Sequence, residues 1–227
     1  MPATIPSRVR SLIASIEATF AARKATDDAV GREIQKILSL LQPLPALTGR
    51  FSKSSQAATR HIEPALRAGN ESTQALLEAI GPVIRYLPWR YSYPPRDDRA
   101  DLGQHIAFAE IVGPEAPFRS DRVCLGLTLI GPQTLYAMHR HPAIELYYVV
   151  AGTAAWTLDD VSRDNQPGTY VLHPSQAVHA MQTRAQPLLA IYFWSGTDVR
   201  TASVYIDSSR AEETGQAKLV IGAPSGV

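Results

Sequence analysis

The chain has 227 residues, of which 45% are hydrophobic and 19% charged, a globular composition with room for one large domain or a compact core with an appendage. Its formal net charge of +1 provides no strong field for nucleic acid or anionic lipid, so neither a nucleic-acid partner nor a membrane partner is expected. The single cysteine, Cys124, excludes an intrachain disulfide framework and makes an intracellular location the default.

The N-terminal segment predicts two amphipathic helices. Its apolar stretches are broken by Ser and Glu within a few residues, too soon for a signal sequence or a membrane span, so we expect a cytoplasmic location. Apolar residues recur at helical spacing over residues 9–20 and again over residues 30–41. The sequence Thr26-Asp27-Asp28 ahead of the second segment is a good helix-start signal.

Residues 54–80 are also helix-like. Pro64 and the Gly69-Asn70 pair are expected to divide them into shorter pieces. We therefore expect an α-helical region over residues 1–80 that packs on the rest of the chain. Just beyond it, the aromatic residues at positions 89, 91 and 93 share one face of an extended segment. Packing of the helices onto the rest of the chain explains them adequately, and a lid over a functional site is the alternative.

The character of the sequence changes at Gly81-Pro82. Beyond this point, short runs rich in Val, Ile, Thr, Tyr and Trp alternate with Gly and Pro, which is typical of closely spaced antiparallel strands. We therefore expect residues 81–227 to form a small sandwich or barrel, with the tail from about Glu212 either a last strand or a loose end. The predicted strands are VCLGLTLI (123–130), ELYYVV (145–150), TAAWTL (153–158), GTYVLH (168–173), AVHAMQT (177–183) and LLAIYFW (188–194).

Two histidines and a glutamate lie close together in the sequence before and within one of these strands. In an extended strand, residues i and i+2 share a face, so His139 and His141 can point at one spot, and Glu145 and Tyr147 share a face just beyond. Imidazoles and a carboxylate that converge in a barrel interior would bind a first-row divalent metal. About thirty residues later, the segment that ends at His179 brings a further histidine onto a strand face.

Together these segments resemble the two motifs of the cupin superfamily. Residues 139–152 match the first motif, H-x-H-x3-E-x6-G, without a gap. Residues 168–179 match the second, G-x5-P-x-G-x2-H, except that Gln176 stands where the motif has glycine, and Thr183 replaces the asparagine that often follows. The resemblance implies a mostly β fold, the cupin barrel of two packed antiparallel sheets, with one divalent transition metal ion. The metal ligands that it implies are His139, His141, Glu145 and His179.

Within this superfamily, the chain resembles the cupin-type dimethylsulfoniopropionate lyases. Tyr147 follows the ligand Glu145 by two residues, and Tyr136 precedes the second motif histidine by five. Trp194 lies on the strand after the last ligand, and a helical region ahead of the barrel fits the longer members of that group. The resemblance implies cleavage of this small sulfonium carboxylate into acrylate and dimethyl sulfide by base-initiated β-elimination.

The residue types suit this reaction. A metal bound to the substrate carboxylate, as a Lewis acid, would acidify the proton on the neighbouring carbon, and Tyr147 is positioned to take that proton. An ordinary Tyr has a pKa of about 10, so a nearby cation, such as the metal, is needed to favour the phenolate. A barrel-lining aromatic that supports Glu145 is the alternative for Tyr147. Tyr136 would orient the substrate, act as a second base or pack.

The aromatic residues of the last strand suggest where the cation of the substrate binds. Trp194 and Tyr192 alternate with Ile191 and Phe193, so both can face the barrel interior and hold the sulfonium group against their π-faces. Core packing is the alternative for both. His173 matches no ligand position of the motif, and we interpret it as a residue behind the ligands or on the surface.

Two other functions stay open from the sequence. A non-haem iron cupin dioxygenase would use the same ligands and depend on oxygen, and a non-catalytic ligand-sensing or storage cupin would bind without turnover. The ligand set accommodates iron, manganese, nickel, cobalt or zinc. Exposed barrel edges and amphipathic helices would suit a homodimer.

Overall fold

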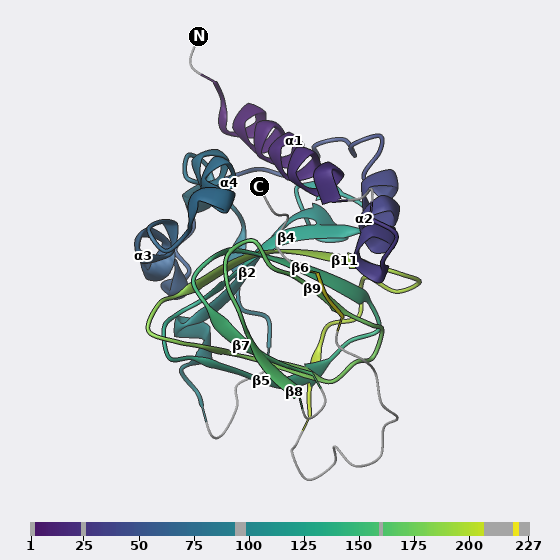
Figure 1. Ribbon diagram of the computed structural model, residues 1–227. Helices are drawn as coiled ribbons and strands as arrows, with labels where there is room; N and C mark the ends of the chain where they lie inside the picture. The colour runs from purple at the N-terminus through teal and green to yellow at the C-terminus, as the bar shows by residue number, and fades with distance from the viewer. Residues whose placement is uncertain (1–2, 24–25, 94–98, 159–160, 207–219, 223–227) are drawn as a thin grey trace.

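The protein folds into two β-sheets that face each other, with its helices packed outside one of them (Figure 1). The computed structural model describes residues 3–23, 26–93, 99–158, 161–206 and 220–222. The predicted mostly β cupin barrel with an α-helical N-terminal region is confirmed. In this part of the chain, no helix is long and apolar enough to cross a membrane. The cytoplasmic location and the homodimer stay predictions.

The helices follow the sequence pattern. Asp28 caps the second long helix, because its carboxylate accepts a hydrogen bond of 2.7 Å from the backbone N–H of Gly31. Pro64 lies in the first turn of a short helix that begins at Ile62, directly after a 3-10 helix that ends at His61, and the missing N–H of a proline costs no helical hydrogen bond there. The helices are α1 (Ile5–Arg23), α2 (Ala29–Leu40), α3 (Ile62–Leu66) and α4 (Gln74–Ile80), with the 3-10 helices η1 (Ala57–His61), η2 (Glu71–Thr73), η3 (Ile84–Tyr86) and η4 (Leu102–Gln104).

The strands form a larger and a smaller sheet, antiparallel except for a short parallel pair between β3 and β2. In sheet order, the larger sheet contains β1 (Trp89–Arg90), β2 (Ile106–Gly113), β4 (Cys124–Ile130), β11 (Leu188–Ser195), β6 (Ile144–Ala151), β9 (Tyr170–His173) and β13 (Val220–Gly222), with β3 (Phe118–Arg119) beside β2. The smaller sheet contains β12 (Val204–Tyr205), β5 (Leu135–Arg140), β10 (His179–Thr183), β7 (Ala154–Leu158) and β8 (Val161–Asn165).

All six predicted strands are present, as β4, β6, β7, β9, β10 and β11. The predicted runs do not include β2, β5 and β8, or the two-residue strands β1, β3 and β12. The strand β2 is buried on both faces and β8 is exposed over most of its length, so neither alternates between apolar and polar residues. The question about the tail is answered for residues 220–222, which pair with β9. The division of the chain into regions 1–80 and 81–227 stays a prediction.

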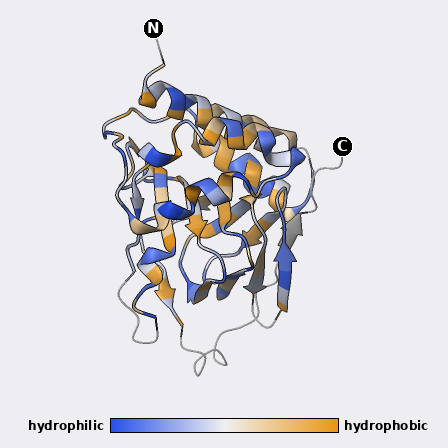
Figure 2. Cartoon of the chain, turned by 90° about the vertical axis from the view of Figure 1, so that its left-hand side faces the viewer, coloured by the Kyte–Doolittle hydropathy of each residue, from blue (hydrophilic) through white to orange (hydrophobic). Residues whose placement is uncertain are grey.

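The outer face of the larger sheet forms a continuous apolar core with the helices. Phe20 of α1 is fully buried there, with its ring centroid 5.6 Å from Tyr148, 5.2 Å from Tyr170 and 5.1 Å from Phe193. All three contacts are edge-to-face, the geometry that aromatic quadrupoles favour. Figure 2 shows the hydrophobic segments of the strands beneath α1. The helices thus hold the larger sheet from outside and leave its inner face free for other groups.

This packing predicts that Phe20→Ala destabilises the whole protein. Removal of a fully buried aromatic ring should lower the free energy of unfolding by about 3–5 kcal/mol. Urea unfolding followed by circular dichroism measures this, with the exposed Ser11→Ala on the same helix as the control, expected within about 0.5 kcal/mol of the original protein. A loss below about 1 kcal/mol for Phe20→Ala would show that α1 does not support the barrel.

Candidate metal centre and active site

The inner face of the larger sheet carries a row of polar and aromatic side chains across three neighbouring strands. The strand register pairs Glu145 of β6 with His173 of β9 on one side and with Trp194 of β11 on the other. Directly paired residues of an antiparallel sheet point to the same face, so these three side chains lie next to one another. Tyr147 and Tyr192 form the neighbouring row in the same way.

The smaller sheet supplies the histidines that face this row. His139 of β5 and His179 of β10 are cross-strand partners, with ring centroids 4.1 Å apart. His141 lies just beyond the end of β5, where its backbone carbonyl accepts a hydrogen bond of 2.9 Å from the N–H of Gln176. Gln176 has φ 63°, in the left-handed region that glycine adopts most easily, which is why the motif has glycine there. The turn before β10 is thereby tied to His141.

Glu145 lies at the centre of the polar cluster. Its Oε2 atom lies 2.9 Å from Nε2 of His141, 3.3 Å from Nε2 of His179 and 3.5 Å from Nδ1 of His173. Its other oxygen, Oε1, accepts a hydrogen bond of 2.7 Å from Nε1 of Trp194. Burial by itself would raise the pKa of Glu145, but these imidazoles outweigh it and hold the pKa well below its ordinary value. The carboxylate is therefore ionised at neutral pH.

In the histidines of the motif, Nε2 is the nitrogen that remains for a metal. In each, Nδ1 contacts a backbone carbonyl, which can only accept, so Nδ1 carries a proton, as in histidines that bind metals through Nε2. The distances to the carbonyl oxygens are 2.8 Å from His139 to Ala137, 3.0 Å from His141 to Ala143 and 2.9 Å from His179 to Ala177.

The cluster fits a divalent transition metal ion. One ligand atom each from His141, Glu145 and His179 lie within 4.8 Å of one another, and all three residues are buried. Nε2 of His179 has no hydrogen-bond partner of good geometry among the described residues, an unusual state for a buried nitrogen that a bound ion would explain.

His139 lies outside this close group, with its ring centroid 6.4 Å from that of His141. Burial lowers the pKa of His139 well below its ordinary value, so it is neutral and able to bind a metal at pH 7.

The two tyrosines predicted to act in catalysis both lie in the barrel interior, 2% exposed each. Burial, followed by the negative charge of Glu145, raises the pKa of Tyr147 well above its ordinary value. The ring of Tyr136 stacks on that of His139, with centroids 3.9 Å apart. The hydroxyl of Tyr136 is hydrogen-bonded to the hydroxyl of Tyr93. Tyr136 is therefore fixed from two sides.

A cavity of about 280 Å³ opens beside these residues. Six of the eight predicted site residues line it, and the other two, His141 and His179, are not among its lining residues. Its size suits a small substrate. The lining side chains that had been predicted are Tyr136, His139, Glu145, Tyr147, Tyr192 and Trp194; those that had not are Tyr93, Phe108, Glu110, Arg90 and Arg200, among others.

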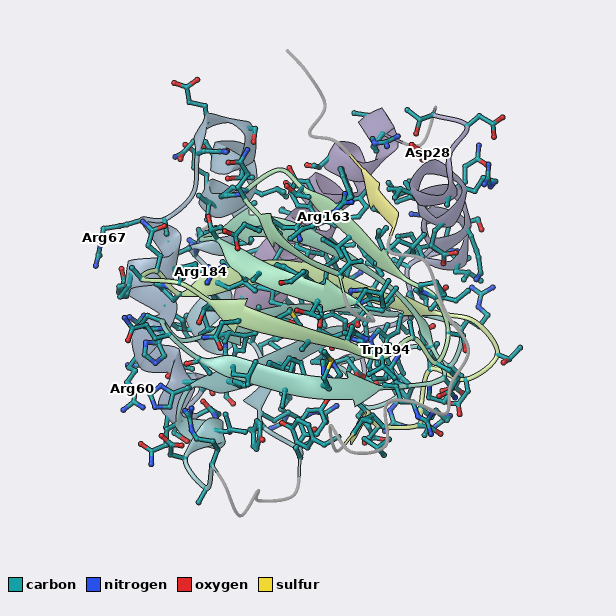
Figure 3. The ribbon with its side chains drawn as sticks, turned by 60° about the horizontal axis from the view of Figure 1, so that its bottom comes forward. Asp28, Arg60, Arg67, Arg163, Arg184 and Trp194 are labelled. Atoms are coloured by element: carbon teal, nitrogen blue, oxygen red, sulfur yellow. The ribbon has the colours of Figure 1, made fainter. Side chains whose placement is uncertain are left out.

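Trp194 has a contact that the sequence did not predict. Besides its hydrogen bond to Glu145, its ring stacks on His141, with centroids 4.4 Å apart and an angle of 28° between the planes. Figure 3 shows Trp194 among the strands, whereas the labelled Arg60 and Arg67 lie at the periphery. Trp194 therefore holds the carboxylate, while its ring and that of Tyr192 also reach the cavity.

His173 and Tyr93 are the site residues that the sequence reading undervalued. A surface position for His173 is wrong: the residue is fully buried and stacks on His179, with ring centroids 3.9 Å apart. Burial lowers the pKa of His173 to about 3, so this imidazole is neutral. Tyr93 belongs to the alternating aromatic segment before the barrel, and this alternation was the signal that could have placed it beside the cavity.

Known proteins that resemble this chain agree with one another. A family model described as dimethylsulfoniopropionate (DMSP) lyase matches residues 29–190. A protein of Cereibacter sphaeroides with the provisional name dimethylsulfoniopropionate lyase DddL is 32% identical over 164 residues, which are 71% of this chain and 68% of that protein. The dimethylsulfoniopropionate lyase DddQ of Ruegeria pomeroyi is 33% identical over 117 residues, 51% of this chain and 58% of that protein.

Solved structures agree with the fold. A chain from the crystal structures of the DMSP lyases RdDddP and RnDddQII superposes with a TM-score of 0.75 at 21% identity, covering 90% of this chain and 100% of that chain. The crystal structure of DMSP lyase DddQ from Ruegeria pomeroyi gives a TM-score of 0.68 at 26% identity, covering 87% of this chain and 95% of that chain. The present chain therefore belongs to the dimethylsulfoniopropionate lyase family.

Proposed function

We propose that this protein is a metal-dependent carbon-sulfur lyase that cleaves dimethylsulfoniopropionate into acrylate and dimethyl sulfide by β-elimination. The observation that carries the mechanism is the placement of Glu145 and Tyr147. These residues lie two apart on the inward face of β6, one within the polar cluster and the other beside it, and both line the same cavity. A metal-binding group and a candidate base thus face one small space.

The metal would be held by one carboxylate and three imidazoles, a set that suits iron, manganese, nickel, cobalt or zinc. A divalent ion bound there would act as a Lewis acid toward the substrate carboxylate and, as a nearby cation, would lower the pKa of Tyr147. The hydrogen bond from Trp194 orients the carboxylate for this role, as groups behind metal ligands commonly do. The proposed ligands are His139, His141, Glu145 and His179.

In the proposed reaction, the phenolate of Tyr147 takes a proton from the carbon next to the substrate carboxylate. The electron pair of that C–H bond forms the new carbon-carbon double bond, and the C–S bond breaks with its pair on sulfur. Acrylate and neutral dimethyl sulfide result, with no oxidation or reduction. Tyr136, fixed by His139 and Tyr93, would orient the substrate or act as a second base.

The aromatic part of the cavity would hold the sulfonium end of the substrate. Tyr192 and Trp194 line the cavity, with ring centroids 6.4 Å apart, and aromatic faces attract onium cations. Phe108 and Tyr93, which line the same cavity 5.9 Å apart, add apolar surface. Burial of the cation among rings and of the carboxylate near the polar cluster would bring the reacting carbon to Tyr147.

The first test is product release without oxygen. Purified protein given dimethylsulfoniopropionate under anaerobic conditions should release dimethyl sulfide and acrylate in equal amounts, measured by headspace gas chromatography and liquid chromatography. Removal of metal with a chelator should abolish the release, and addition of a divalent transition metal should restore it. Product formation only in the presence of oxygen would support a dioxygenase instead, and tight substrate binding without turnover would support a sensing protein.

The role of Tyr147 is tested by Tyr147→Phe. Loss of the proposed base should lower kcat by roughly 10²–10⁴-fold while the protein still binds metal, because the hydroxyl is not a proposed ligand. Tyr148→Phe is the matched control: the neighbouring residue packs on the outer face of the same strand and should leave kcat within about threefold. Equal activities for the two variants would remove Tyr147 from the mechanism.

The pH dependence follows from the raised pKa of Tyr147. A tyrosine whose pKa lies above the working pH is mostly protonated, so its reactive phenolate fraction increases about tenfold for each pH unit. The value of kcat/KM should therefore rise with pH through the neutral range and level off only above the apparent pKa of the metal-loaded enzyme. Initial rates at constant ionic strength measure this profile. A profile that is flat or falls as pH rises would contradict a tyrosine base.

A further inference from the structure

His173 differs from the other buried histidines of the site, and this difference has a consequence if the proposed metal site is correct. In His139, His141 and His179, Nδ1 contacts a backbone carbonyl and Nε2 is left for the metal. In His173, Nδ1 faces the side chain of Glu145 at 3.5 Å. We propose that His173 is a positioning residue, which holds the Glu145 carboxylate in place for metal binding and is not itself a ligand.

The strand order gives His173 a defined place in this arrangement. Strand β6 lies between β9 and β11, so Glu145 is flanked by His173 on one side and by Trp194 on the other. Trp194 donates to Oε1, and Nδ1 of His173 faces Oε2. Under the proposal, an N–H on Nδ1 of His173 gives the carboxylate a polar contact opposite the hydrogen bond from Trp194 and limits its rotation about its last bond. The two flanking side chains therefore act as a pair on one metal ligand.

The contacts of His173 all lie among the residues of the site. Neither of its ring nitrogens has a hydrogen-bond partner of good geometry among the described residues, so the 3.5 Å between Nδ1 and Oε2 of Glu145 is a polar contact rather than a hydrogen bond. His173 is nevertheless fully buried, stacked on His179 and edge-on to Tyr147, with ring centroids 5.9 Å apart. Its ring thus also fills space behind a ligand and the proposed base.

Three substitutions separate the donor from the ring. His173→Phe keeps a ring of similar shape but has no donor. His173→Asn lacks the ring but keeps an N–H group at the position of Nδ1, whereas His173→Gln places its N–H one bond farther, near the position of Nε2. If His173 acts through Nδ1, Asn should preserve the metal site, and Phe and Gln should not.

The experiment measures the affinity for Co²⁺ by chelator competition, together with the visible absorption spectrum of the Co²⁺ protein. Loss of a group that orients a metal ligand commonly weakens metal binding 10–100-fold. We expect a loss of this size in His173→Phe and His173→Gln, and a change below about threefold in His173→Asn, with absorption bands at the wild-type positions. Circular dichroism and thermal melts establish that each variant is folded. If His173→Phe does not fold, the comparison between Asn and Gln decides.

Two outcomes would overturn the proposal. Affinity within threefold of wild type in both His173→Phe and His173→Gln would mean that the imidazole only fills space. Shifted Co²⁺ bands in the Asn variant as well as in the others would mean that His173 is itself a ligand. Failure of the wild-type protein to bind Co²⁺ is a different result, because it would contradict the proposed metal site, on which the role of His173 depends.

Discussion

The interior of the barrel depends on one buried negative charge, the carboxylate of Glu145. Removal of an ionised carboxylate from water costs several kcal/mol unless partners compensate for it. Here the imidazoles of His141, His173 and His179 surround one oxygen and the indole of Trp194 binds the other. These groups come from β6, β9, β10, β11 and the end of β5, so the charge can be compensated only when both sheets are assembled. The polar cluster therefore forms only when the two sheets have packed together.

The larger sheet can hold this charge because its outer face is apolar and its inner face carries the polar groups. Along β6, Leu146 and Tyr148 point outward into the apolar core with the helices, whereas Glu145 and Tyr147 point inward to the cavity. The period of two in a strand thus separates a stabilising face from a chemical one. The apolar contacts of the helices with the outer face contribute to the free energy of folding and offset the free-energy cost of burying polar groups inside the barrel. The helices therefore support the site although they do not line it.

The electrostatics of the cluster join metal binding to base strength. Without a cation, the negative charge of Glu145 and the burial of Tyr147 both oppose formation of a phenolate. Burial lowers the pKa of His139 and His173, so these two imidazoles add no positive charge of their own. A single divalent ion would satisfy the nitrogens of the ligand histidines, balance the carboxylate and favour the phenolate. Under the proposed function, one ion therefore makes the site both stable and reactive.

The sequence by itself determined the fold class, six of the thirteen described strands and the group His141, Glu145 and His179 that the structure brings together. It could do so because strand alternation and motif spacing are local properties, and Glu145 and Tyr147 lie two residues apart. Tertiary structure alone decided the roles of Trp194 and His173, which flank Glu145 from strands far away in the sequence. Strand order and register set these contacts, and no local pattern encodes either. For the same reason β2 and β8 escaped prediction: one is buried on both faces and the other exposed, and burial is a property of the assembled fold.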